Sequence, residues 1–319
     1  MSYTPVIRDW PADRAILIVH GIGNTQTGGG EEIEAAVRAA LGPDADSIAI
    51  YQLYYDGIND WFAGKTQAAA LISKLVGKFR QSEQNQALAD TLADYAGDVL
   101  WPVMSVSARV AVRSAYIAQL QQVVNDGVRC GHAPAQQRLT IITHSLGCFH
   151  TYEALHEISR QSSYKLQPGT HHVRFENVIS MASPVQLIRS VAGAMGAAVP
   201  DRTTLTTLSD AGLSLPEQKR LDGVVVPSAK RWISIAGDLD PVGGYALRKR
   251  LAWAYADIPG QLSLIDQESA VTIANGDDLR TALHASLRTG KAPAIAPNDP
   301  HSWTAYVGRH ADDIKGWVA

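Results

Sequence analysis

The sequence predicts a single α/β domain built on a mostly parallel sheet flanked by helices. Short runs rich in Ile, Val and Leu alternate along the chain with stretches of helical periodicity, which is the pattern of strand–helix–strand units. The 319 residues suffice for one large domain, and we see no internal repeat or low-complexity segment that would divide them. We therefore expect one domain over residues 1–319, interrupted by a helical cap.

The first strand–helix–strand unit is expected near the N-terminus. An apolar strand at 15–20 leads into the glycine-rich turn GIGNTQTGGG. The helix that follows carries apolar residues at four-residue spacing from Ile33 to Leu41, and Gly42 supplies a stop after it. A second strand is expected at 47–55.

The stretch from residue 57 to residue 110 departs from this alternation, because it has the pattern of consecutive amphipathic helices. We expect it to form a helical cap inserted into the domain. The next helix has an apolar face that includes Tyr116, and we expect it to belong to the sheet scaffold and to close at Gly127. Residues 186–228 are a candidate second cap segment.

Strand signals resume in the second half of the chain. An apolar strand at 138–143 is followed by a helix that starts near Gly147. Further strands are expected at 176–184 and 231–241, and a last helix is expected to start near Ser302. This order of elements supports a doubly wound α/β domain.

Composition limits the classes of function. Lys and Arg number 28 against 31 Asp and Glu, so the net charge of -3 lacks the basic balance of nucleic-acid-binding proteins. No apolar run approaches a bilayer span, and the N-terminal residues lack the basic and apolar segments of a secretory signal. We expect a cytoplasmic protein without a transmembrane segment, although export by a route that needs no such signal stays open. The sequence does not indicate an oligomeric state.

The two cysteines, Cys130 and Cys148, are too few for a disulfide scaffold and have no metal-site spacing. We expect both to be reduced thiols, with Cys148 as a small core residue. The sequence shows no site for a metal or another cofactor, so we expect none.

The segment THSLG, residues 143–147, is typical of a nucleophile between a strand and a helix. A sharp turn there lifts the side chain of Ser145 above the sheet edge and favours glycine two residues before and after it. Gly147 fits the second of these positions, whereas Thr143 occupies the first. Ser145 could equally be a helix N-cap, so its partners in the rest of the chain must decide.

An acyl-transfer enzyme needs two backbone N–H groups aimed at one developing oxyanion. The N–H of Leu146, directly after the nucleophile, is one expected donor. The turn HGIGNT after the first strand supplies the other, the N–H of Ile22. This turn also begins as G-x-G, but Gln26 stands where a dinucleotide-binding loop has its third glycine, so a nucleotide site is not favoured.

A carboxylate and then a histidine are expected after the nucleophile. Asp240 precedes Pro241 just beyond an expected strand, which keeps its backbone extended. Asp238 is the competing carboxylate, and it is less favoured because it lies nearer the strand end, where the turn can engage it. His301 follows Pro300 just before the last helix, so its imidazole is expected on a loop above the sheet.

With the motifs HGIGNT, THSLG, GDLDPVGG and PHSWTAY in this order, the chain resembles the lipase and esterase branch of the α/β-hydrolase superfamily. VISMASPV is also similar to the strand and Ser-Pro turn that follow the nucleophile helix in many such lipases. The resemblance covers residues 14–318 and implies an eight-stranded, mostly parallel sheet with a cap over the substrate pocket. It agrees with a Ser145–His301–Asp240 triad that cleaves carboxylic esters through an acyl-enzyme.

The substrate is less closely defined by the sequence. Trp61 and Phe62 open the insertion and are expected to line an acyl pocket, with simple core packing as the alternative. The expected partner is a small-molecule or lipid ester of unspecified chain length. Two other functions stay open: a catalytically inactive binding module of the same fold, and a phospholipase or acyltransferase that uses the same triad.

Overall fold

The structure is a computed structural model. The residues that it describes are 3–21, 30–58, 106–160, 175–184, 217–219, 225–227, 229–237, 261–266 and 303–318. Most of the cap predicted at 57–110, and most of the candidate second segment at 186–228, lie outside these residues.

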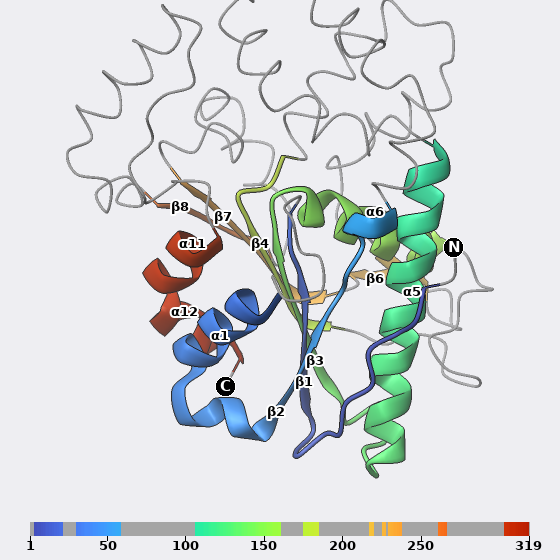
Figure 1. Cartoon of the computed structure of the whole chain (residues 1–319), viewed down its shortest axis with the longest axis horizontal. Coiled ribbons are helices and arrows are strands. Elements are labelled where there is room, and N and C mark those ends of the chain that lie inside the picture. Colours follow the sequence, from blue (N-terminus) through green and yellow to red (C-terminus); the bar gives the residue numbers. More distant parts are fainter. Residues whose placement is uncertain are drawn as a thin grey trace, which may run out of the picture.

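A six-stranded sheet forms the centre of the molecule (Figure 1). Its strands, in spatial order, are β2 (Ile48–Gln52), β1 (Arg14–Val19), β3 (Arg138–His144), β4 (Phe175–Met181), β7 (Ala229–Gly237) and β8 (Gln261–Asp266). Every neighbouring pair is parallel, so the carboxyl ends of all these strands lie along one edge. The α/β fold with a mostly parallel sheet is therefore confirmed. A separate antiparallel pair joins β5 (Glu217–Lys219) and β6 (Val225–Pro227).

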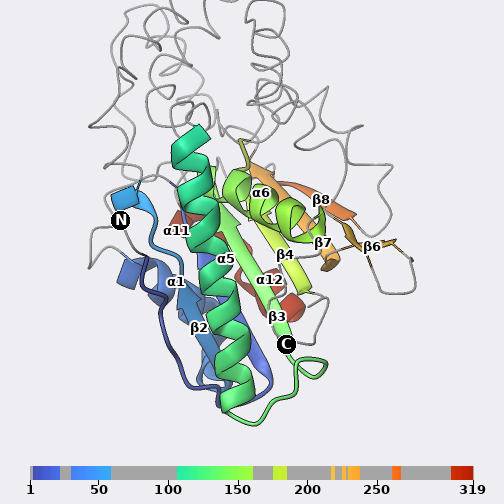
Figure 2. The same ribbon diagram turned by 90° about the vertical axis from the view of Figure 1, so that its right-hand side faces the viewer.

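Helices cover both faces of the sheet. One face carries α1 (Gly30–Leu41), α11 (Trp303–Arg309) and α12 (Ala311–Val318), and the other carries α5 (Val106–Arg129) and α6 (Leu146–Arg160) (Figures 1 and 2). The side chains of β1 alternate between two cores. Ile16 and Ile18 pack under α1 and α11, whereas Leu17 and Val19 pack under α5 and α6. Burial on both faces explains why these strands are continuous apolar runs in the sequence.

The sequence predicts that two helices end at glycines, Gly42 and Gly127, and the structure bears out the first of these. Gly42, with φ of 61°, ends α1 as predicted and begins the short 3-10 helix η1 (Gly42–Ser47). The predicted end of α5 at Gly127 is wrong, because this helix continues to Arg129. Gly131, with φ of 92°, is the residue that ends it.

The end of α5 is a Schellman motif. The N–H of His132 donates to the carbonyl of Gly127 (2.8 Å), and the N–H of Gly131 donates to that of Val128 (3.0 Å). Gly127 is needed for packing instead, since a Cβ there would lie 2.6 Å from Nε2 of Gln137.

The C-terminal part of the chain differs from the expectation in two details. The single predicted helix is two helices, α11 and α12, which meet at the turn residue His310. Trp303 and Ile314, one from each helix, nevertheless belong to the same core. The sequence pattern did not predict β8, because QLSLID is short and interrupted by a polar residue.

The two cysteines are thiols, as the sequence predicts. Cys130 and Cys148 are both free, and Cys148 is buried with its thiol donating to the carbonyl of Met181 (3.3 Å). Burial raises the pKa of the Cys148 thiol to about 12, which makes it an inert core group, as expected. Among the helices in the described ranges, none is long and apolar enough to cross a membrane.

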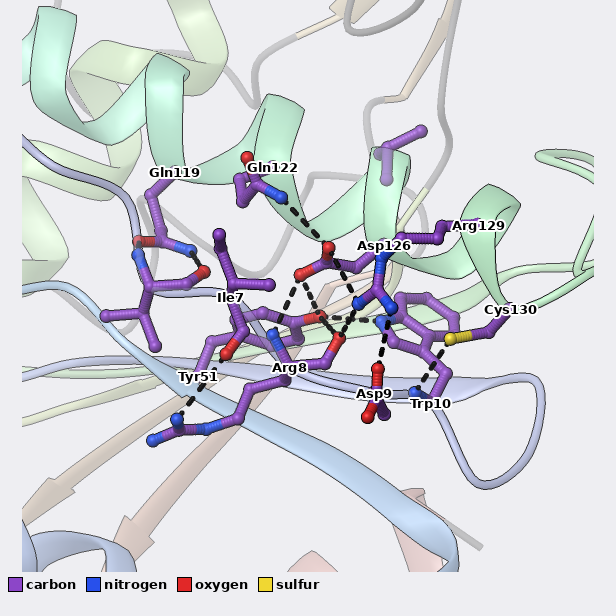
Figure 3. Close-up of polar contacts among 12 residues, drawn as sticks. Ile7, Arg8, Asp9, Trp10, Tyr51, Gln119, Gln122, Asp126, Arg129 and Cys130 are labelled. Atoms are coloured by element: carbon purple, nitrogen blue, oxygen red, sulfur yellow. Dashed lines mark hydrogen bonds and ion pairs between the residues drawn. The ribbon is translucent and has the colours of Figure 1, made fainter.

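The segment before β1, residues 3–10, is bound to α5 by buried side chains, and we call it the N-terminal strap (Figure 3). Asp126 on α5 is 1% exposed and accepts four hydrogen bonds. The donors are the backbone N–H of Arg8, the hydroxyl of Tyr51, the side-chain amide of Gln122 and the guanidinium of Arg129, at 2.9 to 3.2 Å. Gln119, also buried, accepts from the N–H of Val6 and the hydroxyl of Tyr3, both at 2.8 Å.

Candidate functional site

Ser145 lies at the junction of β3 and α6, and its backbone is unusual. Its φ is 52°, in the left-handed region that non-glycine residues rarely adopt. Its N–H donates to the carbonyl of Met181 (3.0 Å), and its own carbonyl accepts from the N–H of Cys148 (2.9 Å) in the first turn of α6. The chain therefore passes from strand to helix at this one residue, at a conformational cost of about 1–3 kcal/mol.

This backbone conformation bears on the helix-cap alternative. An N-cap residue typically has an extended backbone while its side chain accepts a bond from the first turn. The φ of Ser145 does not fit that description. It fits the strained strand-to-helix turn on which a nucleophile is presented, so the cap interpretation is not favoured.

Two glycines make this turn sterically feasible. A Cβ at Gly147 would lie 2.5 Å from the carbonyl oxygen of His20, and it would also overlap that of Val19. A Cβ at Gly21 would lie 2.6 Å from Cβ of Ser145 and 3.2 Å from its hydroxyl oxygen. Gly147 therefore brings the start of α6 against the end of β1, as the sequence motif predicts. Gly21 brings the turn after β1 directly against the serine.

Thr143 stands where the motif has its first glycine. Its side chain is fully buried, and its hydroxyl pairs with that of Thr151 on α6 (3.3 Å). Thr151 in turn accepts a hydrogen bond from the hydroxyl of Tyr116 on α5 (2.9 Å). A hydroxyl at position 143 is thus satisfied within the helix layer, which explains why threonine fits here.

Leu146, an expected oxyanion donor, is buried as the first residue of α6. The other predicted site residues lie outside the described residues: Ile22, Trp61, Phe62, Asp238, Asp240 and His301. Two described residues lie close to them in sequence: Gly237, which ends β7, and Trp303, which begins α11.

Strand β7 ends at Gly237, one residue before Asp238, on the same edge of the sheet as Ser145. Because β7 is two strands from β3, its end lies about 10 Å from Ser145, a distance that an imidazole between them can span. Asp266, which the sequence interpretation missed together with β8, ends the next strand and pairs with Gly237. Its strand is about 14 Å from β3, so the spacing favours an acid after β7.

Helix α11 brings the chain near His301 to the nucleophile turn. The ring of His144, directly before Ser145, lies edge-on to Trp303 and Tyr306, with centroid distances of 5.7 and 5.9 Å. Trp303 is two residues after His301, and two residues span at most about 7 Å. Helix α11 is thus anchored beside the serine turn.

A parallel sheet with helices on both faces carries a strained serine turn after its third strand in chain order. The fold is a parallel α/β fold whose third strand in chain order ends in a strand-to-helix turn of the kind that presents a serine side chain. In such a fold the serine of the strand-to-helix turn stands at the carboxyl edge of the sheet, where Ser145 lies.

Comparison with known proteins gives structural likenesses at low identity. No protein-family model matches the sequence, and no curated protein sequence matches it. A lipase-esterase related protein from Clostridium acetobutylicum is 8% identical, with a TM-score of 0.41, over 96% of this chain and 95% of that one. An acetyl ester-xyloside bifunctional hydrolase from Caldicellulosiruptor lactoaceticus is 11% identical, with a TM-score of 0.40, over 90% and 86%. A siderophore hydrolase from Aspergillus fumigatus is 13% identical, with a TM-score of 0.34, over 92% and 94%.

Buried ionisable side chains lie on the α5–α6 side of the sheet, near the serine turn. Arg109 near the start of α5 forms a buried ion pair with Glu153 of α6. His150, 2% exposed, packs edge-on against the ring of Tyr55 at 4.9 Å. Burial, with smaller effects of Arg109 and His20, lowers the pKa of His150 to about 3. A histidine with so low a pKa is a weak general base.

Within the described residues, no group of three or more His, Cys, Asp or Glu side chains is arranged to hold a metal ion.

Proposed function

We propose that the protein is a serine hydrolase that cleaves carboxylic esters through an acyl-enzyme formed on Ser145. The observation that carries this proposal is the left-handed backbone of Ser145 between two glycine contacts. A serine that only packed or capped a helix would not need this strained conformation, whereas a nucleophile presented above a sheet edge does.

The rest of the proposed triad is His301 as the base and Asp240 as the acid. The end of β7 on the same sheet edge and the contact of Trp303 with His144 support this assignment. His301 removes the proton from the Ser145 hydroxyl, and Asp240 holds the imidazole in the required tautomer and stabilises its charged form.

The reaction then has two halves. Ser145 Oγ attacks the acyl carbon, the tetrahedral oxyanion collapses, and His301 returns the proton to the departing alcohol. Water, deprotonated by His301, attacks the acyl-enzyme and releases the acid. The N–H groups of Ile22 and Leu146 are the proposed oxyanion donors, and each is worth about 3 kcal/mol of transition-state stabilisation.

A fluorophosphonate probe tests the nucleophile directly, since it requires an activated serine and no knowledge of the substrate. We expect the wild-type protein to be labelled and Ser145→Ala to be unlabelled. Ser180→Ala is the matched control, because Ser180 is a buried serine on the neighbouring strand β4, and it should keep the label. Folded wild-type protein that takes up no probe would favour an inactive binding module instead.

The substrate class needs a second experiment. Esters of increasing acyl length should be assayed with and without phospholipid vesicles. We expect hydrolysis of soluble esters that depends on Ser145, with Trp61 and Phe62 affecting chain-length preference through the acyl pocket. Activity that appears only with dispersed long-chain lipid would identify a lipase or phospholipase, and transfer of the acyl group to an added alcohol would identify an acyltransferase.

A further inference from the structure

The segment that connects β2 to the predicted insertion lies against the turn that ends β1. We call residues 53–58 the β2 exit segment. It is anchored to β1 by a hydrogen bond from the N–H of Leu53 to the carbonyl of Ile18 (2.9 Å). Two of its side chains, Tyr55 and Asp56, then contact His20, which directly precedes Gly21.

Tyr55 holds His20 by its ring and by its hydroxyl. The two rings are stacked, 5.1 Å apart and 6° from parallel, and the hydroxyl donates to the carbonyl of His20 (2.7 Å). Tyr55 is fully buried, and burial raises the pKa of its hydroxyl well above the usual range. The hydroxyl therefore keeps its proton and acts as a hydrogen-bond donor.

Asp56 faces the ring nitrogen of the same histidine. Its Oδ2 lies 3.9 Å from Nδ1 of His20, and that nitrogen also contacts the carbonyl oxygen of Gly21 at 2.5 Å. A carbonyl oxygen can only accept, so Nδ1 carries the proton and donates it to Gly21. The Asp56 carboxylate lies close enough to attract the dipole of this N–H and so to favour this orientation of the ring.

The Gly21 carbonyl, which His20 contacts, belongs to the same peptide group as the N–H of Ile22, the proposed oxyanion donor. The Gly21 carbonyl and the N–H of Ile22 are parts of one peptide, and in a trans peptide these two groups point in opposite directions. A contact that fixes the carbonyl therefore also fixes the direction of the N–H. Gly21 itself lies against Ser145, where a Cβ would be 3.2 Å from the hydroxyl oxygen.

We propose that Tyr55 and Asp56 are positioning residues that act through His20 to hold the Gly21–Ile22 peptide in the orientation of an oxyanion donor. This inference rests on the proposed hydrolase function and adds a requirement to it.

Two nearly isosteric variants test the proposal. Tyr55→Phe removes the hydroxyl and keeps the stacked ring, and Asp56→Asn removes the charge and keeps the shape. Loss of one oxyanion donor costs about 100- to 1,000-fold in kcat, so partial misorientation should lower kcat about 10-fold or more. We expect KM for p-nitrophenyl acetate to change less than about two-fold, because ground-state binding does not use the donor. The rate of fluorophosphonate labelling should fall in parallel with kcat.

Tyr51→Phe is the matched control. Tyr51 is on β2, directly before the β2 exit segment, and its buried hydroxyl donates to Asp126 at the N-terminal strap, away from the serine turn. Its loss should lower the melting temperature and leave kcat unchanged. If kcat fell only because the protein was less stable, Tyr51→Phe would lose as much kcat as Tyr55→Phe. Equal losses of kcat in these two variants would contradict the proposal.

A double-mutant cycle separates positioning from packing. In a His20→Asn background, Asp56→Asn should cause little further loss of kcat, because both changes act on the same peptide. Additive losses, or single variants with kcat within about two-fold of wild type, would overturn the inference while the hydrolase function stands. A wild-type protein without Ser145-dependent labelling would overturn the proposed function itself, and the inference with it.

Discussion

The serine turn and the N-terminal strap are two tightly packed regions of one fold, and they are built on opposite principles. At the strap, the buried carboxylate of Asp126 accepts four hydrogen bonds from groups on three separate parts of the chain. At the turn, Ser145 holds a left-handed backbone, and neighbouring backbones approach so closely that Gly21 and Gly147 have no room for a Cβ. The strap contributes stability, whereas the turn retains a conformation that costs stability and presents a side chain.

The largest expected effect is on activity at the turn. Ser145→Ala should reduce kcat by about 10,000-fold or more, because removal of the nucleophile abolishes the acyl-enzyme route. Its free energy of unfolding, measured by urea denaturation, should stay within about 1 kcal/mol of wild type. Residual hydrolysis near the wild-type rate would show that another group does the chemistry.

Gly147→Ala tests the steric part of the comparison. A methyl group here meets backbone carbonyl oxygens of Val19 and His20 that cannot move independently, so we expect a destabilisation of about 3 kcal/mol or more. Gly308→Ala on α11 is the control, because a Cβ there meets nothing within 4 Å and alanine favours helix. Equal melting temperatures for the two variants would contradict the close approach at the turn.

Asp126→Ala tests the strap. It leaves several buried donors without their acceptor, so the free energy of unfolding should fall by about 2–3 kcal/mol. Activity per folded molecule should not change, in contrast to the effect at the turn. Asp9→Asn removes only an exposed ion pair with Arg129 and should change stability by less than about 1 kcal/mol. A loss of kcat in Asp126→Ala would show that the two regions are coupled.

Lower pH should reduce the stability of the protein through His150, which is buried in α6, the helix that follows Ser145. Its pKa is lowered to about 3, so between pH 6.5 and pH 3 the unfolded chain binds one more proton at this residue than the folded chain does. The free energy of unfolding therefore falls as pH falls through this window, by up to about 1.4 kcal/mol per pH unit, or about 2 kcal/mol at pH 5.

The measurement is urea denaturation from pH 7 to pH 4 for wild type and His150→Gln. The variant should lose this part of the pH dependence. The control His310→Gln, which changes a histidine paired with exposed Asp313, should keep it. Parallel pH profiles for wild type and His150→Gln would contradict a buried neutral imidazole.

The two regions also differ in how far the sequence could predict them. The serine turn depends on neighbours in sequence, so THSLG was enough to predict a strand-to-helix turn at Ser145 and the close approach at Gly147. The strap depends on contacts between residues about 115 positions apart, such as Val6 with Gln119, and no local pattern records them. The contact of Tyr55 and Asp56 with His20 is hidden for the same reason.

Local signals also misled where packing decided the outcome. Gly127 resembled a helix stop, but it lies inside α5, with the side chain of Gln137 packed close against it. Strand β8 has too short an apolar pattern to stand out, so Asp266 at its end was not considered as an acid. The α/β class and the order of the main strands could be predicted because each buried strand is an apolar run in its own right.

The central claim is that residue 145 is an activated nucleophile on a strained turn. The most direct test is mass spectrometry of the fluorophosphonate-treated protein, first intact and then as peptides. We predict one adduct per chain, carried by the peptide that contains Ser145. An adduct on another residue, or an unmodified Ser145 in protein that is folded and otherwise reactive toward esters, would contradict the account.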